Sequence, residues 1–154
     1  MYLTLLALHS VIRWFVVIIL GLTLAASWQG WLSNRPYTPT DARLRSIATS
    51  ITHLQLLLGF VLYFKSPITG YFRENFRESL NSSDLTFFGL IHISLMLVAV
   101  VVLTFGSSLG KRAATDAQKH RTVALYFLAG TLILLAAVPW PFSPLAQRPL
   151  FRSF

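Results

Sequence analysis

The sequence predicts an all-α fold, an integral membrane bundle of four transmembrane helices. Of its 154 residues, 55% are hydrophobic and only 12% are charged, whereas soluble domains carry roughly 25% charged residues. The apolar residues are concentrated in four runs, and a helix needs about 20 residues to cross the hydrocarbon core. We therefore exclude a soluble domain and expect one transmembrane domain over residues 1–154.

The first two helices are expected over residues 3–29 and 39–65. The first apolar run begins at Leu3 and is long enough for one span. The second helix begins before its apolar part, because the segment from Thr38 to Asp41 has the spacing of a capping box and places a proline at the first helical position.

The last two helices are expected over residues 84–108 and 116–138. The fourth apolar run is short, but Thr115 and Gln118 have the spacing of a capping box, which extends that helix back to Asp116. Between the second and third helices we expect a loop that is long enough to cover a site. The long runs and the lack of an alternating pattern argue against a membrane β-barrel.

Basic residues between the apolar runs predict the orientation of the bundle. They occur in the first connection (Arg35, Arg43, Arg45) and in the third (Lys111, Arg112, Lys119, Arg121). Short loops rich in Lys and Arg face the cytoplasm, so we expect an N-out/C-out topology. The net charge of +8 is then a topology signal, and we expect the lipid bilayer, not nucleic acid, as the partner.

The chain has four histidines, one in each predicted helix: His9, His53, His92 and His120. His9 and His92 lie at similar positions in two helices that run in the same direction, so we expect them at one depth on the outer side. Short connections place these two helices diagonally across the bundle. Two opposed imidazoles at one depth suit the axial ligation of a haem iron.

His53 and His120 belong to the two helices that run in the opposite direction, and both are candidates for a second pair in the inner half. Their positions relative to the apolar runs differ by roughly 13 Å at 1.5 Å per residue. His120 could therefore serve a haem propionate or the cytoplasmic face instead. The sequence leaves open whether the protein holds one haem or two.

Two other polar features belong to the same interpretation. Arg13 lies four residues after His9 on the same helix face, and we expect it to bind a haem propionate; a quinone head group and a helix carbonyl are the alternatives. Helix two carries Ser46, Thr49, Ser50 and His53 on one stripe. We expect this stripe to face the bundle, either toward the site or as hydrogen-bonding contacts between helices.

Other metal centres are poorly supported by the sequence. Cysteine is absent, and no Asp or Glu lies within the apolar runs to complete a zinc or di-iron carboxylate site. Motifs for a serine nucleophile, a phosphate-binding loop or a dinucleotide are also missing.

Several stretches resemble a family of small four-helix bacterial membrane proteins identified as cytochrome b. They are Leu8-His9-Ser10-Val11-Ile12-Arg13-Trp14, His53-Leu54-Gln55-Leu56-Leu57-Leu58-Gly59, Tyr63-Phe64-Lys65-Ser66-Pro67, Lys119-His120 and Pro139-Trp140-Pro141-Phe142. One histidine per helix is also similar to the core of di-haem transmembrane cytochromes b of the ascorbate-reducible type. That likeness implies an outer haem on His9 and His92 and an inner haem on His53 and His120, although this chain has only four helices and a shallow fourth histidine.

The expected function is that of a b-type cytochrome with haem b in the bacterial inner (plasma) membrane. It would carry electrons within or across the membrane, from quinol or as the membrane subunit of a larger oxidoreductase. Two alternatives remain: a haem- or quinone-handling assembly factor, and a structural subunit of a respiratory or photosynthetic complex.

Overall fold

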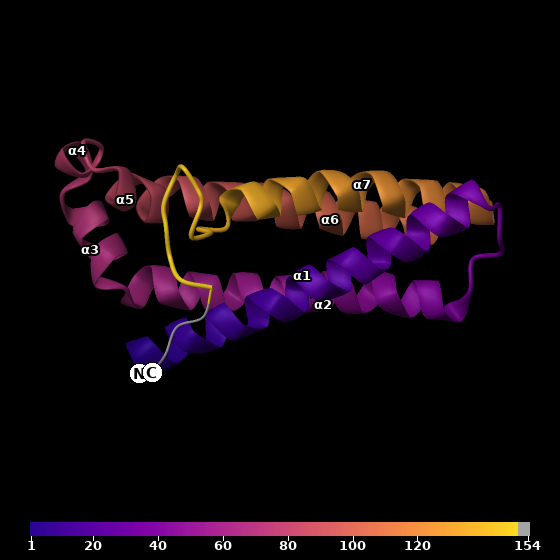
Figure 1. Cartoon of the computed structure of the whole chain (residues 1–154), viewed down its shortest axis with the longest axis horizontal. Helices are drawn as coiled ribbons and strands as arrows, with labels where there is room; N and C mark the ends of the chain where they lie inside the picture. Colours follow the sequence, from indigo (N-terminus) through magenta and orange to yellow (C-terminus); the bar gives the residue numbers. More distant parts are fainter. Residues whose placement is uncertain (151–154) are drawn as a thin grey trace.

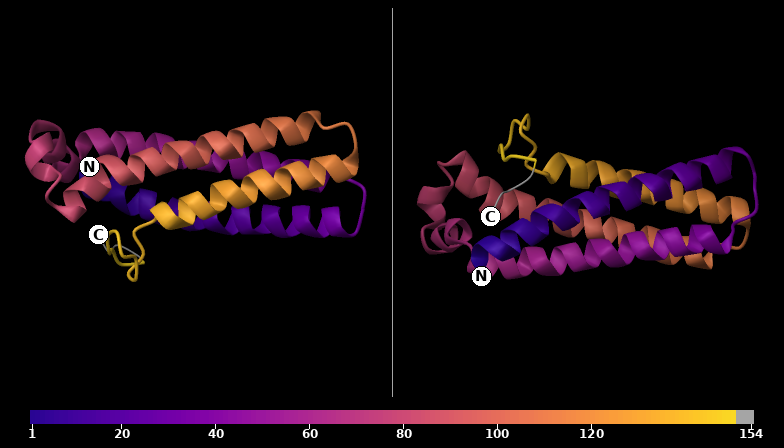
Figure 2. Two further views of the ribbon diagram at one scale, coloured as in Figure 1. Left: turned by 90° about the horizontal axis from the view of Figure 1, so that it is seen from above. Right: turned by 60° about the horizontal axis from the view of Figure 1, so that its bottom comes forward.

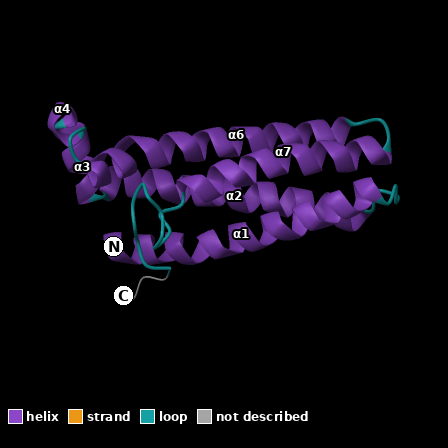
Figure 3. Cartoon of the chain, turned by 45° about the horizontal axis from the view of Figure 1, so that its top comes forward, coloured by secondary structure: helices purple, strands orange, loops and turns teal. Residues whose placement is uncertain are grey.

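A computed structural model of the protein describes residues 1–150, and this part of the chain is helical without strands (Figures 1 and 3). Four helices are long and apolar enough to cross a membrane. They are α1 (Tyr2–Leu32), α2 (Pro39–Lys65), a continuous span from Ser83 to Arg112, and α7 (Asp116–Ala137). The chain is therefore a multi-pass membrane protein with an all-helical bundle, as expected.

The third span consists of three consecutive segments. A short helix α5 (Ser83–Thr86) leads into a π-helix η1 (Phe87–Ile91), which continues directly as α6 (His92–Arg112). The expected outer loop is mostly helical: it contains α3 (Pro67–Glu74) and α4 (Phe76–Ser79).

The four spans pack as a square. Helix α1 packs against α2 and α7, and α6 packs against α7 and α2. The pairs α1–α6 and α2–α7 are therefore diagonal, which is the expected arrangement (Figure 2). The core between them contains Val16, Leu20, Leu103 and Phe127, all nearly or fully buried.

The N-terminus and the described part of the C-terminal tail lie at the same end of the bundle as α3, α4 and α5 (Figure 1). We call this the termini end. The opposite end carries the α1–α2 and α6–α7 connections with their arginines and lysines, and we call it the basic end. The two short connections whose Lys and Arg residues predicted the orientation thus lie at the same end of the bundle.

The capping signals position two helix starts correctly. The Thr38 hydroxyl accepts a hydrogen bond from the Asp41 backbone N–H, and the Asp41 carboxylate accepts one from the Thr38 backbone N–H, so the capping box is complete. Thr115 accepts from the Gln118 N–H at the start of α7. These contacts satisfy backbone donors that a helix start leaves unpaired.

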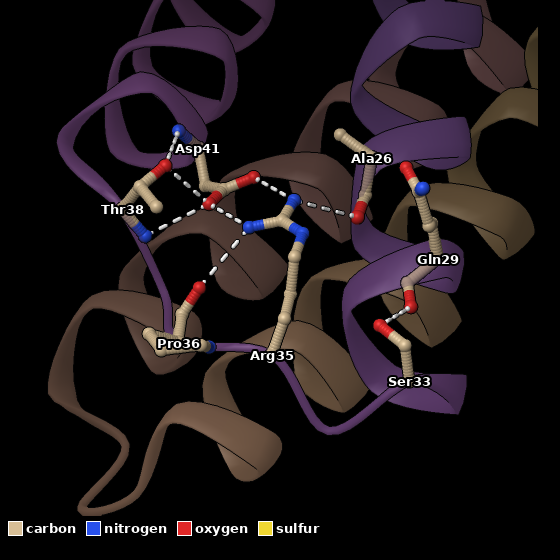
Figure 4. A network of polar contacts seen from close by, with 7 residues as sticks. All are labelled: Ala26, Gln29, Ser33, Arg35, Pro36, Thr38 and Asp41. Atoms are coloured by element: carbon tan, nitrogen blue, oxygen red, sulfur yellow. Dashed lines mark hydrogen bonds and ion pairs between the residues drawn. The ribbon is translucent and has the colours of Figure 1, made fainter.

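A polar network at the basic end connects α1 to α2 (Figure 4). The Arg35 guanidinium binds both carboxylate oxygens of Asp41 at 2.7 Å and also donates to the carbonyls of Ala26 and Pro36. Asp41 is buried, with 6% of its surface exposed. The hydrogen bonds to Asp41 raise the pKa of Arg35 above its ordinary value. Because Arg35 joins α1 to α2 through these contacts, it has a structural role as well as its role as a topology signal.

The expectation that the polar stripe on α2 faces the bundle is wrong for Ser46 and Ser50, whereas His53 makes one of the expected hydrogen bonds between helices, to Thr104 on α6. Ser46, Ser50 and His53 lie on the exposed face of α2, whereas the buried face carries Ala48 and Thr52. Helical spacing groups these residues correctly on one face. The stripe faces away from the bundle because small and apolar side chains fill the tight contact with α1 and α6.

Candidate functional site

A cavity of about 170 Å³ opens at the termini end and lies between α1, α2 and α6. Its lining extends from Tyr2 and Ser66 near that end to Val16 and Val100 deeper in the bundle. Most of the lining is apolar, with a few polar groups among the aliphatic side chains. This composition is typical of cofactor and ligand sites, whereas the volume is smaller than the roughly 300–1,000 Å³ that such sites usually enclose.

His9 and His92 both line this cavity, and they come from the diagonal helices α1 and α6. Space for the His9 ring is provided by Gly59 on α2, where a Cβ atom would lie 3.5 Å from His9 Cε1. The structure therefore brings together the pair that the sequence predicted for the outer site.

The orientation of His92 is set by a hydrogen bond. Its Nδ1 lies 2.8 Å from the carbonyl oxygen of Ala137 at the end of α7. A carbonyl can only accept, so Nδ1 carries the proton and Nε2 keeps its lone pair. Metal-ligating histidines usually donate their other ring N–H in this way.

The π-helix η1 ends at Ile91, directly before His92. The backbone N–H of His92 donates to the carbonyl of Phe87, five residues earlier instead of four. Single π turns within α-helices occur frequently at functional sites. The apolar pattern of the third span gives no sign of this wide turn, so the sequence could not have revealed it.

Gln55 is a cavity residue that the sequence analysis did not single out. Its Nε2 donates to the backbone carbonyl of His9 at 2.9 Å. In the described part of the chain, Gln55 Oε1 and His9 Nδ1 are both buried without a hydrogen-bond partner. The two atoms do not bond to each other, so the contact that links Gln55 to His9 is the one to its backbone carbonyl.

Arg13 lines the same cavity, as expected from its spacing to His9. Its Nη2 donates to the carbonyl of Leu150 at 2.6 Å, and its guanidinium lies 5.7 Å from the ring centroids of both Trp14 and Trp140. The partner that the structure shows is a main-chain carbonyl of the C-terminal tail, which was not among the expected partners.

A second arginine, Arg148 in the same tail, also lines the cavity. It forms an ion pair with Asp84 at 2.9 Å and lies 4.8 Å from the ring centroid of Phe88. No sequence motif singles out Arg148, because only the folded tail brings it to the site.

His53 lies elsewhere, on the exposed face of α2 beside α6. Its Nε2 is 3.0 Å from the Thr104 hydroxyl, and that hydroxyl donates its only hydrogen to the Val100 carbonyl at 2.6 Å. The Thr104 oxygen must therefore accept from His53.

His120 is fully buried in the second turn of α7. Its ring lies against the backbone of Gly30, and its centroid is 4.9 Å from that of Tyr37. Neither ring nitrogen has a hydrogen-bond partner among residues 1–150. Burial in this region also raises the pKa of the Tyr37 phenol.

The structure does not bring His53 and His120 together. They lie on the diagonal helices α2 and α7, at different depths, and their contacts have no residue in common. Within residues 1–150 there is also no group of three or more His, Cys, Asp or Glu side chains suited to a metal ion. The cavity contains two imidazoles, those of His9 and His92. A six-coordinate haem iron binds two axial ligands from a protein.

Comparisons of the sequence with protein-family models, with curated proteins and with solved structures found no match. Arguments about function therefore depend on the geometry of the cavity.

Proposed function

We propose that the protein is a b-type cytochrome of the bacterial inner membrane, with a haem iron held by His9 and His92. One observation carries the proposal: imidazoles from two diagonal helices line the same apolar cavity. The hydrogen bond from His92 to Ala137 supports it, because it leaves Nε2 with a free lone pair.

The chain itself would supply binding, orientation and electrostatics. Gly59 leaves room beside His9, and Gln55 holds the His9 backbone. Arg13 and Arg148 place two cations on the cavity wall, where they could bind the propionate groups of a haem. Haem would provide the one-electron redox couple.

Electron transfer within or across the membrane is the role that follows from such a site. The basic end would face the cytoplasm, so the cavity would open on the outer side. The donor would be a quinol, or the protein would act as the membrane subunit of a larger oxidoreductase. The proposal takes one haem, because His53 and His120 do not line a common cavity with each other.

Absorbance spectra and a pyridine haemochrome count on the purified protein test this proposal. We expect reduced b-type bands, about one haem per chain, and loss of that haem in both His9→Ala and His92→Ala. His53→Ala is the matched control, since it removes a histidine outside the cavity, and it should keep its haem.

Three results would contradict the proposal. Full haem content in either cavity variant would exclude that histidine as a ligand. Substoichiometric, readily lost haem would favour an assembly factor. Colourless protein that copurifies with a large complex would favour a structural subunit.

A further inference from the structure

The exposed side of α2 carries Arg43 near the basic end and, beyond it, three polar residues that the cavity does not use. We call Ser46, Ser50 and His53 the α2 polar face. His53 donates through Nε2 to Thr104, so in the neutral ring the Nδ1 atom keeps a lone pair that can accept a hydrogen bond.

The two serines also have unused hydrogen-bonding capacity. Threonines in the same bundle donate their hydroxyls to the carbonyl four residues earlier: Thr23, Thr49, Thr52 and Thr104. The described structure shows no such bond for the hydroxyl of Ser46 or Ser50. Both groups are free to donate to a neighbour outside the chain.

Ser50 and His53 lie within the apolar part of α2 and would face lipid, whereas Ser46 lies at the edge of that part, three residues from Arg43. Large apolar residues surround them on the same side of α2, with Ile47, Leu54 and Leu57 exposed to 52%, 49% and 62%. Hydrocarbon tails cannot donate or accept hydrogen bonds, and a polar side chain exposed to them is unfavourable. A protein surface covering the α2 polar face would remove this penalty.

We propose that a second copy of this chain covers the α2 polar face, forming a dimer about a two-fold axis along the membrane normal. Two copies inserted in the same orientation place identical residues at the same depth, so the polar groups of one meet those of the other. The face is self-complementary, because serine hydroxyls can donate and His53 Nδ1 can accept. Ser46 and Ser50 are small and four residues apart, which lets two helices approach closely.

The dimer does not depend on the haem proposal. The cavity is lined by other α2 residues, among them Thr52, Gln55 and Gly59, whereas the α2 polar face lies on the exposed side of the helix. Failure of one proposal would therefore leave the other intact.

The absence of cysteine from the sequence allows a direct test. Ser50→Cys gives the chain one thiol on the proposed interface. Leu22→Cys is the matched control, because Leu22 is 53% exposed on α1 and lies at a similar distance from the basic end. Each variant is expressed at a low level and oxidised with copper phenanthroline in its native membrane.

We expect a disulfide-linked band of twice the chain mass for Ser50→Cys and monomer for Leu22→Cys. Monomer in both variants, or equal cross-linking of both by random collision, would overturn the proposal. A cross-linked band of a different mass would also overturn it, because the occupant would then be another membrane protein.

A second measurement tests the polar contact itself. His53→Leu replaces a polar side chain of the α2 polar face by an apolar one and should leave the fold intact, but it removes the acceptor. Single-molecule photobleaching in vesicles should then show dimerisation about three- to tenfold weaker than in the wild type. Unchanged dimerisation would show that His53 takes no part in the interface.

Discussion

Gly30 gives the most clearly determined prediction, because its substitution by alanine has two opposing effects of different size. A Cβ atom at Gly30 would overlap Cε1, Nδ1 and Nε2 of His120. That ring is fully buried and also packs against Tyr37, so it has little room to move. Overpacking of this kind typically costs about 1–3 kcal/mol, and the severe overlap favours the upper value.

The opposing effect comes from helix propensity. Replacing glycine by alanine within a helix gains about 1 kcal/mol. The net loss for Gly30→Ala is therefore about 2 kcal/mol, which corresponds to a melting temperature lower by about 4–8 °C for a chain of this length. Thermal unfolding in detergent, followed by circular dichroism, measures this shift.

Two controls isolate the steric cause. Gly21 lies in the same helix with nothing within 4 Å of its virtual Cβ, so Gly21→Ala should be neutral or stabilising. The double variant Gly30→Ala/His120→Ala should be more stable than the sum of the two single changes predicts, because alanine at position 120 frees the space. A Gly30→Ala protein as stable as the wild type would refute the reasoning.

Two further predictions concern other parts of the molecule. Asp41→Asn should lower stability by about 2 kcal/mol, because it leaves the Arg35 guanidinium without its buried anion; an unchanged melting temperature would contradict this role. Gly59→Ala should keep its haem, since a Cβ there makes only an ordinary contact with His9, whereas Gly59→Leu should lose haem at unchanged helix content. Full haem content in Gly59→Leu would exclude the cavity as the binding site.

Features that depend on local sequence were predictable. The capping residues Thr38 and Thr115 marked the starts of α2 and α7, because capping involves residues only three apart. The spacing of His9 and Arg13 placed them on one face, and both line the cavity.

The sequence did not predict whether the polar face of α2 points into the bundle or away from it. Ser46, Ser50 and His53 form a stripe in either case, but apolar side chains are as compatible with lipid as with a protein core. Hydrophobicity therefore does not show which side of a membrane helix packs inward. The position of α2 is set by the tight contacts of small buried residues such as Ala48.

Contacts between distant segments were also beyond the sequence. The tail reaches Arg13 through the carbonyl of Leu150, and Gln55 reaches the backbone of His9 from the neighbouring helix. Such contacts depend on the rotation of each helix about its axis, which the length of an apolar run does not determine.

The wide turn η1 has a consequence for how the third span tolerates change. A π turn contains one residue more than an α turn, so the chain before it is rotated by about 100° relative to the helix after it. Loss of one residue between Phe87 and Ile91 would convert it to an ordinary α turn without breaking the span. His92 would keep its place on α6, while α5 and the segment leading into it would swing around the helix axis. A one-residue deletion in η1 would thus move α5 and the segment before it without moving the His92 imidazole.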